Sequence, residues 1–188
     1  MTREKAIKLL HKNMQNVNLR RHCYAVEAVM KSLAVRLKGD PEVWGMAGLL
    51  HDADYELVKD NAKKEHTKQT IKWLKELDAS TDIQDAIASH AWGYVDDAPE
   101  PKSKMEWALY TCDELTGLIV AVGLIKPNKK LDSVTVDSVM KKWKTKSFAG
   151  GVDRKQIEQC DERLGIPMRE FVEIALKAMQ NIHDDLGL

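Results

Sequence analysis

The sequence predicts an all-α fold, a compact bundle of helices in a single domain over residues 1–188. Apolar residues recur at helical spacing along the chain, and no stretch alternates apolar and polar residues for long enough to form a sheet. The five prolines and ten glycines are few and stand between the helical segments. A chain of 188 residues can bury a proper core, and no repeat, low-complexity run or linker divides it.

The first two helices are predicted from their capping residues and apolar stripes. Thr2 opens a short helix that runs to about Gln15. Asn18 is expected to cap a long helix, which Gly39 ends. The inward stripe of this second helix contains Cys23, Val26, Val29, Met30, Leu33 and Leu37.

The next helices follow in the same way. Asp40 is an N-cap followed by a proline at the first helical position, and this helix runs to about Ala53. A further helix is expected over about residues 63–77, and Thr81 is expected to cap another that runs to His90.

A loop over residues 93–102 leads into the most apolar helix. Ser103 and Glu106 form a capping-box pair at its start, and it reaches about Ile125. Its composition is apolar enough for a central position in the bundle. Three shorter helices are expected after it, near residues 134–144, 153–164 and 167–184.

Composition excludes several classes of protein. The 29 basic and 29 acidic residues balance, which argues against a nucleic-acid polymer or a membrane surface as a partner. The three cysteines are far apart, so neither a disulfide framework nor a thiolate zinc site is expected. The N-terminus lacks an apolar signal region, and the longest apolar run, residues 115–125, is about half of the ~20 residues that a membrane-spanning helix needs. We therefore expect a cytoplasmic protein.

The doublet His51–Asp52 is the centre of the functional prediction. It follows an apolar helical segment, residues 47–50, and burying these two side chains without partners would cost several kcal/mol. A lone histidine on an inward face is usually a core residue bonded to a backbone carbonyl. Here five helices each offer an inward His or Asp, which favours a shared metal centre. The candidate ligands are His22, His51, Asp52, His66, His90 and Asp113.

These residues resemble the signature of the HD-domain metal-dependent phosphohydrolase superfamily. The order His22, His51–Asp52, Asp113 carries the resemblance over about residues 18–125, and His66 and His90 match the additional histidines of the binuclear members. The layout is similar to small stand-alone bacterial HD proteins, some of which hydrolyse dinucleoside polyphosphates. The resemblance implies a metal site at the centre of the bundle. The C-terminal helices, about residues 132–186, carry no recognised motif, and we expect them to pack on this core.

The resemblance also implies the roles of the ligands. His22, His51, Asp52 and Asp113 match the ligands of a first metal, and Asp52 bridges to a second that His66 and His90 hold. Four nitrogens and two carboxylates suit one or two divalent ions of Fe, Mn, Ni or Zn, with Mg as a further option, and disfavour calcium. Such a centre would activate a water molecule for attack on phosphorus, with Asp52 as a catalytic residue.

One departure from the family pattern bears on the substrate. Many relatives continue the doublet with Ile-Gly-Lys, whereas this chain has Ala53–Glu56, and the phosphate-binding lysine is absent. Asp54 or Glu56 is a candidate for orienting water or handling protons, and Glu56 could equally be a solvated acid in a loop. Candidate substrate-binding residues are Arg21, Trp92, Lys146 and Arg154.

For the remaining residues, a surface or packing role is an alternative to a functional one. Lys146 and Arg154 lie around Gly150–Gly151, which is also consistent with a solvated basic turn. The acidic loop over residues 96–100 could gate the site or belong to the surface. His11 and His183 fall outside the ligand pattern and are expected to be surface or packing residues.

Three functions are consistent with the sequence. The leading hypothesis is a metal-dependent phosphohydrolase acting on a small phosphorylated substrate, a nucleotide or dinucleotide. The first alternative is an HD-fold di-iron oxygenase that cleaves a C–C or C–P bond, because the resemblance implies the same ligand set for both. The second is a non-catalytic metal-binding or ligand-binding module. The oligomeric state is open, with a homodimer as one option.

Overall fold

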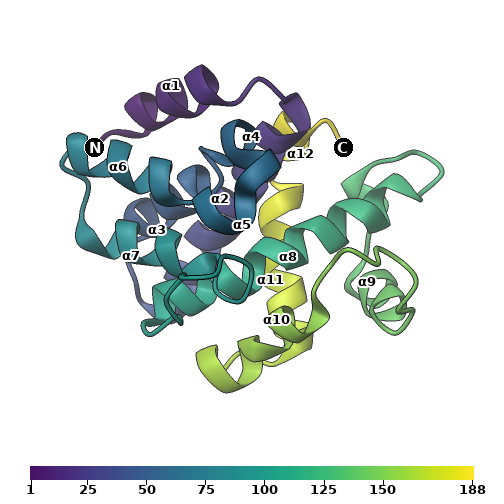
Figure 1. Ribbon diagram of the computed structural model, residues 1–188. Helices are drawn as coiled ribbons and strands as arrows, with labels where there is room; N and C mark the ends of the chain where they lie inside the picture. Colours follow the sequence, from purple (N-terminus) through teal and green to yellow (C-terminus); the bar gives the residue numbers. More distant parts are fainter.

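The all-α prediction is confirmed by the computed structural model, which describes all 188 residues and contains no β-strand (Figure 1). Only an isolated bridge joins Trp92 and Val95. Single turns of 3-10 helix occur at η1 (Lys59–Asn61) and η2 (Leu131–Ser133), and a π-helical turn at η3 (Cys160–Leu164). The α-helices are α1 (Arg3–Asn13), α2 (Val17–Leu37), α3 (Pro41–Leu50), α4 (Tyr55–Val58), α5 (Ala62–Glu65), α6 (Lys68–Glu76), α7 (Thr81–His90), α8 (Lys104–Leu124), α9 (Val136–Trp143), α10 (Arg154–Gln159), α11 (Met168–Gln180) and α12 (His183–Leu186).

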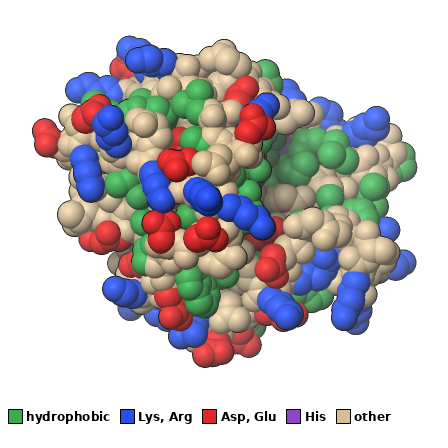
Figure 2. Space-filling model, in the orientation of Figure 1, with side chains coloured by type: hydrophobic (Ala, Val, Ile, Leu, Met, Phe, Trp, Pro, Cys, Tyr) green, Lys and Arg blue, Asp and Glu red, His purple; other side chains and the backbone are tan.

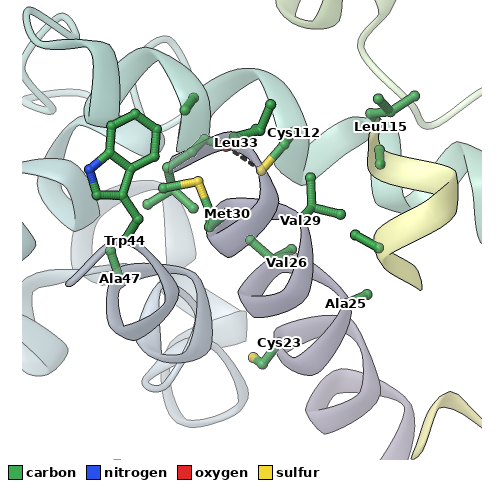
Figure 3. Packing of buried hydrophobic residues seen from close by; sticks show 14 of the residues in the cluster. Cys23, Ala25, Val26, Val29, Met30, Leu33, Trp44, Ala47, Cys112 and Leu115 are labelled. Atoms are coloured by element: carbon green, nitrogen blue, oxygen red, sulfur yellow. Dashed lines mark hydrogen bonds between the residues drawn. The ribbon is translucent and has the colours of Figure 1, made fainter. Parts of the chain in front are cut away.

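Helices α2, α3 and α8 form the centre of the core. Figure 3 shows side chains of α2, among them Val26, Val29 and Met30, meeting Trp44 of α3 and Cys112 of α8. The backbones of α2 and α3 approach each other closely at Gly48, where a β-carbon would lie 2.9 Å from backbone atoms of α2. A side chain at this position would therefore push the two helices apart, and glycine permits the close packing.

Helix α8 is the most buried long helix and has an apolar composition. By length and composition it could span a membrane, but 67% of the apolar window is buried inside the protein. It contacts α2, α3, α7, α9, α10 and α11. This burial is what a central helix of a globular bundle requires, and the apolar composition is explained by it.

The C-terminal helices cover α2 and α8. Helix α11 packs on both, α10 packs on α8, and α9 packs on α8 and α11. In Figure 1, α1 lies at the top of the view and α9 and α10 lie toward the bottom. A single cluster of 46 buried hydrophobic residues contains members from Ala6 to Leu188. Acidic and basic side chains are interspersed over the face drawn in Figure 2.

The capping predictions are confirmed at α1, α3 and α8, and α10 is capped in the same way. The side chains of Thr2, Asp40 and Asp153 accept hydrogen bonds from the first backbone N–H groups of α1, α3 and α10. Ser103 and Glu106 form the predicted capping box at the start of α8. These contacts satisfy N–H groups that a helix itself leaves without partners.

Three predicted boundaries were wrong. The side chain that caps α2 is Asn16, which accepts from the N–H groups of Asn18 and Leu19, so the helix begins two residues earlier than expected. Thr81 is the first residue of α7 and does not cap it. The helix predicted over residues 63–77 is interrupted at Thr67, where φ is +73°. This interruption shapes the site described next.

Candidate metal centre

Five segments of the chain bring six histidine and aspartate side chains together. His22 lies in α2 and Asp113 in α8, while the doublet follows the last turn of α3. The other two are His66, between α5 and α6, and His90, at the end of α7. The side chains are largely removed from solvent, and His51 is completely buried. All six residues predicted as ligands are therefore neighbours in the structure.

One half of the cluster surrounds the carboxylate of Asp113. Its Oδ1 lies 2.8 Å from His22 Nε2 and 3.5 Å from His51 Nε2. The two imidazole Nε2 atoms are 3.2 Å apart. Ligand atoms of these three residues lie within 4.8 Å of one another, close enough to hold one metal ion.

The other half surrounds Asp52. Its Oδ1 lies 3.2 Å from His66 Nε2 and 3.6 Å from His90 Nε2, and these two nitrogens are 3.2 Å apart. Its Oδ2 points the other way, 3.6 Å from His51 Nε2 and 3.8 Å from His22 Nε2. A second possible metal group combines Asp52 with His51 and His90. Asp52 therefore faces both halves with one oxygen each.

Backbone carbonyls fix the orientation of two of the imidazoles. The Nδ1 of His51 lies 2.8 Å from the Gly48 carbonyl, and the Nδ1 of His90 lies 2.6 Å from the Ile87 carbonyl. A carbonyl oxygen only accepts hydrogen bonds, so each Nδ1 carries the proton. The Nε2 of each ring is then left with a lone pair that points into the cluster.

Side chains fix the other two imidazoles in the same sense. The Thr116 hydroxyl donates to the Asp113 carbonyl at 2.8 Å, so it accepts from the Nδ1–H of His22 at 3.2 Å. The Nδ1–H of His66 donates to Asp54 Oδ1 at 2.9 Å. Four Nε2 atoms therefore converge, each oriented by a hydrogen bond on the opposite side of its ring, which is the usual support of a histidine metal ligand.

The donor set fits divalent transition metals. Nitrogen lone pairs that face each other at 3.2 Å repel unless a proton or a metal ion lies between them. The two carboxylates would balance part of the charge of such ions. Four imidazole nitrogens with two carboxylates suit Fe, Mn, Ni or Zn better than Ca, which prefers oxygen ligands.

In the metal-free protein, protons bound to the imidazoles supply positive charge next to the two carboxylates. Burial alone would lower the pKa of His51, but the charges of Asp52 and Asp113 raise it to about 9. The pKa of His66 is likewise raised to about 9, because hydrogen bonds to Asp52 and Asp54 outweigh burial. The pKa of His90 is lowered by burial. Burial opposes ionisation of the two carboxylates, but the histidines hold the pKa of each well below its usual range.

Asp54 positions His66 and belongs to neither half of the cluster. Its carboxylate is completely buried and also accepts from the backbone N–H groups of Thr67 at 3.1 Å and Thr70 at 3.0 Å. These bonds hold Thr67 at φ +73°, a left-handed conformation that a β-branched residue rarely adopts. The chain turns between α5 and α6 at this point, and His66 faces Asp52. The proton-handling role considered for Asp54 stays a prediction, and the contacts describe a positioning residue.

A cavity of about 600 Å³ opens beside the cluster. Five of the six candidate ligands line it, and His51 lies behind them. No Lys or Arg lines the cavity. Its other polar and aromatic lining residues are Tyr55, Trp92, Tyr94, Tyr110, Glu114, Asp153 and Gln156.

Several of these lining residues were missed from the sequence. Tyr110, Glu114 and Gly117 lie three residues before, one after and four after Asp113, so they occupy the same side of α8. That spacing was available as a signal once Asp113 was a candidate. Burial, and then the charge of Asp113, raise the pKa of Glu114 to about 7. Of the four residues predicted to bind substrate, only Trp92 lines the cavity.

The three basic candidates lie elsewhere. The guanidinium of Arg154 contacts five backbone carbonyls of residues 143–152, and that of Arg21 lies against Gly187. Lys146 is exposed and does not line the cavity. Binding of substrate by these side chains stays a prediction that their positions do not support.

Glu56 and the two remaining histidines also lie outside the cavity. The Glu56 carboxylate accepts from the backbone N–H groups of Gln15 at 2.7 Å and Asn16 at 2.9 Å, which links α4 to the turn between α1 and α2. His11 contacts the Tyr24 hydroxyl, and His183 pairs with Asp184. Glu56 thus supports the segment that follows the doublet, and its catalytic role stays a prediction.

Comparison with known protein families finds a match that covers the N-terminal part of the chain and its candidate metal centre. The sequence model of the family described as HD domain matches residues 19–118, just over half of the chain. The matched span begins in α2, ends in α8 and contains all six candidate ligands. A search of curated protein sequences finds no match to the chain.

Proposed function

This chain belongs to the HD-domain family, and from that premise we propose that it is a metal-dependent phosphohydrolase of a small phosphorylated substrate. One observation carries the proposal. Asp52 presents one oxygen to each half of a cluster whose four imidazoles are all oriented by second hydrogen bonds. Such an arrangement of ligands supports a binuclear centre that opens into a substrate-sized cavity.

The residues divide into holding and positioning roles. His22, His51 and Asp113 would hold one metal, His66 and His90 the other, and Asp52 would contact both. Bound divalent metals would supply an activated water molecule and would polarise the phosphoryl oxygens. Asp54 keeps the Nδ1 proton on His66, and the Gly48 carbonyl keeps it on His51, so the Nε2 atoms stay available to metal.

The test combines metal analysis with a panel of phosphorylated compounds. We expect one to two equivalents of transition metal in protein purified without chelators, and phosphate release with Mn²⁺ or Fe²⁺. Asp52→Ala should lose metal and reduce phosphate release to background, whereas the exposed Asp60→Ala on the nearby η1 turn should behave as wild type. Absence of metal affinity would favour a non-catalytic module, and full turnover by Asp52→Ala would overturn the assignment.

A second variant tests the number of metal ions. His90→Ala removes one Nε2 from the half of the cluster around Asp52 Oδ1. We expect the metal content to fall by about one equivalent relative to wild type. His183→Ala, which removes a histidine outside the cavity, is the matched control. Two bound ions in purified His90→Ala would contradict the assignment of His90 as a metal ligand.

One observation favours an HD-fold di-iron oxygenase as a second candidate. The cavity provides no Lys or Arg to stabilise the departing oxygen of a phosphate ester. Oxygen consumption by the iron-loaded protein with an organophosphonate or a polyol would support this candidate. The same result together with no release of phosphate from any ester would replace the hydrolase proposal.

A further inference from the structure

The cavity beside the metal cluster contains more carboxyl groups than the set of candidate ligands requires. Beyond Asp52 and Asp113, the carboxylates of Glu114 and Asp153 also line it, and no Lys or Arg does. A phosphate group at the metal cluster can be balanced by the metals. Any additional negative charge on a substrate would lie in a cavity without a protein cation.

Two arginines that adjoin lining residues in the sequence, Arg20 and Arg154, donate to backbone carbonyls. Arg154 contacts the carbonyls of residues 143, 145, 148, 149 and 152, with its closest contact at 2.7 Å from Nη2 to the Phe148 carbonyl. Arg20 donates to the carbonyls of Met14 at 2.6 Å and His11 at 3.1 Å. Moving either guanidinium to a substrate would leave these carbonyls without their donors.

Backbone N–H groups at the edge of the cavity are occupied as well. The N–H of Asp153 donates to Glu114 Oε2 at 3.0 Å. The N–H groups of Lys155 and Gln156 donate to Asp153 Oδ1 at 2.9 and 3.3 Å. These backbone N–H groups at the start of α10 therefore donate to protein carboxylates and are not free to donate to an anionic substrate.

Aromatic rings lie beside these carboxylates. The ring centroids of Trp92 and Tyr110 are 5.6 Å apart, and both rings line the cavity. Burial and the negative charges of Asp153 and Glu114 raise the pKa of the Tyr110 hydroxyl. Tyr110 precedes the candidate ligand Asp113 by about one turn of α8, a rise of ~5 Å.

We propose that the cavity selects a small substrate that carries a phosphoryl group at the metal cluster and an ammonium group against an acidic aromatic wall, formed by Trp92, Tyr110, Glu114 and Asp153. This inference rests on the proposed function and specifies its substrate class. Aromatic faces and carboxylates both attract an ammonium group. Tyr110 and Glu114 lie on the same side of α8 as Asp113, which favours a spacer of a few atoms between the two groups of the substrate. A polyphosphate chain would meet the carboxylates of the wall.

The test uses two phosphonates that resist hydrolysis and differ only in charge. 3-Aminopropylphosphonate and butylphosphonate have the same length, but only the first ends in an ammonium group. We expect calorimetry on the Mn²⁺-loaded full chain to show about tenfold tighter binding of the aminophosphonate. ADP should bind more weakly than the aminophosphonate. Equal affinities for the two phosphonates, no binding of either, or tighter binding of ADP would overturn the proposal.

Conservative substitutions in the wall test whether it causes the preference for the aminophosphonate over butylphosphonate. Glu114→Gln retains an oxygen that can accept from Asp153 N–H, and Asp153→Asn retains an N-cap residue. Each should reduce the affinity ratio of the two phosphonates to about threefold or less. Glu158→Gln removes the same charge from the exposed side of α10 and should keep the full ratio. An unchanged ratio in both wall variants would contradict the assignment.

Hydrolysis measurements separate failure of this inference from failure of the proposed function. The substrates are 2-aminoethyl phosphate and propyl phosphate, its counterpart of the same length without the ammonium group. Turnover of both at equal kcat/KM would leave a phosphohydrolase without an ammonium preference. Turnover of neither, together with the tenfold binding preference, would leave the wall intact and remove the phosphohydrolase assignment.

Discussion

The metal cluster and the acidic aromatic wall lie in one cavity but are built differently. Every histidine of the cluster is fixed by a second hydrogen bond, and all six ligands fall in the span that matches the HD-domain family. The wall is completed by Asp153, which lies outside that span and follows a loop held by Arg154. Three of the four wall residues lie in the matched span with the candidate ligands, and only Asp153 lies outside it. The difference teaches that the candidate ligands are all fixed within that span, whereas the proposed wall also depends on a loop beyond it.

Asp54→Ala tests how far the cluster depends on its buried support. The substitution leaves the His66 Nδ1–H and the N–H groups of Thr67 and Thr70 without their acceptor in a dry interior. We expect the free energy of unfolding of the metal-free protein to fall by about 3–5 kcal/mol. Denaturant unfolding measures this loss, and metal content reports the freed His66.

The control for this prediction is Asp60→Ala, which removes an exposed carboxylate from the neighbouring turn. It should change the free energy of unfolding by less than about 0.5 kcal/mol. Similar stabilities for Asp54→Ala and wild type would show that the bonds to Asp54 do not support the cluster.

Arg154→Ala tests the support of the wall. Five carbonyls of residues 143–152 lose a shared donor, although water can reach part of this loop. We expect a loss of about 2 kcal/mol in the free energy of unfolding and faster proteolysis within the loop. Metal content should stay at the wild-type value, while the preference for the aminophosphonate falls.

Lys155→Ala is the matched control, since it removes a neighbouring exposed cation that makes no such contacts. Arg154→Lys is informative too, because a lysine offers three donors from one point and cannot reproduce the fork of a guanidinium. Loss of metal from Arg154→Ala would mean that the support of the wall and the support of the cluster are coupled.

The sequence predicted the cluster better than the wall, for a physical reason. Helix periodicity places His22, His90 and Asp113 on inward faces, and the doublet follows an apolar helix end, so convergence could be expected. The break at Thr67 could not, because the backbone bonds to Asp54 that hold its positive φ join residues 13 and 16 positions apart.

The basic residues show where sequence reasoning fails. Arg154 lies near glycines and beside an N-cap, a pattern that indicates anion binding, but its guanidinium turns back to the preceding loop. Which carbonyls surround a side chain depends on the path of the loop, and local sequence does not encode that path. Conversely, Tyr110 and Glu114 share a helix side with Asp113 and were predictable from spacing alone.

The pH dependence of metal binding tests the charge balance of the cluster. In the metal-free protein the pKa values of His51 and His66, raised from 6.5 to about 9, stabilise the fold below pH 6.5. That contribution is lost as pH rises toward 9. Metal binding requires the deprotonated rings and therefore strengthens over the same range. The gain in Tm from excess Mn²⁺ should widen between pH 6.5 and 8.5 by about 3 °C or more.

Asp52→Ala provides the control for the pH series, since its gain in Tm from Mn²⁺ should stay small throughout. Calorimetry in buffers of different ionisation enthalpy measures the protons released on binding. A gain in Tm that is constant with pH, or binding without proton release at pH 7, would contradict the protonated state assigned to the metal-free cluster.

Glu56→Ala should have the smallest effect of these substitutions. It tests whether the Glu56 carboxylate has a structural role or a catalytic one. Glu56 lies only four residues after the doublet His51–Asp52. Its carboxylate accepts hydrogen bonds from two solvent-accessible backbone N–H groups in the turn before α2. Water can replace these bonds, so we expect a loss of about 1 kcal/mol in the free energy of unfolding and unchanged metal content. Retained stability with lost phosphate release would instead support the catalytic role considered for Glu56. Lost stability with normal turnover, measured against Asp60→Ala, would place this carboxylate with the structural supports of the cluster.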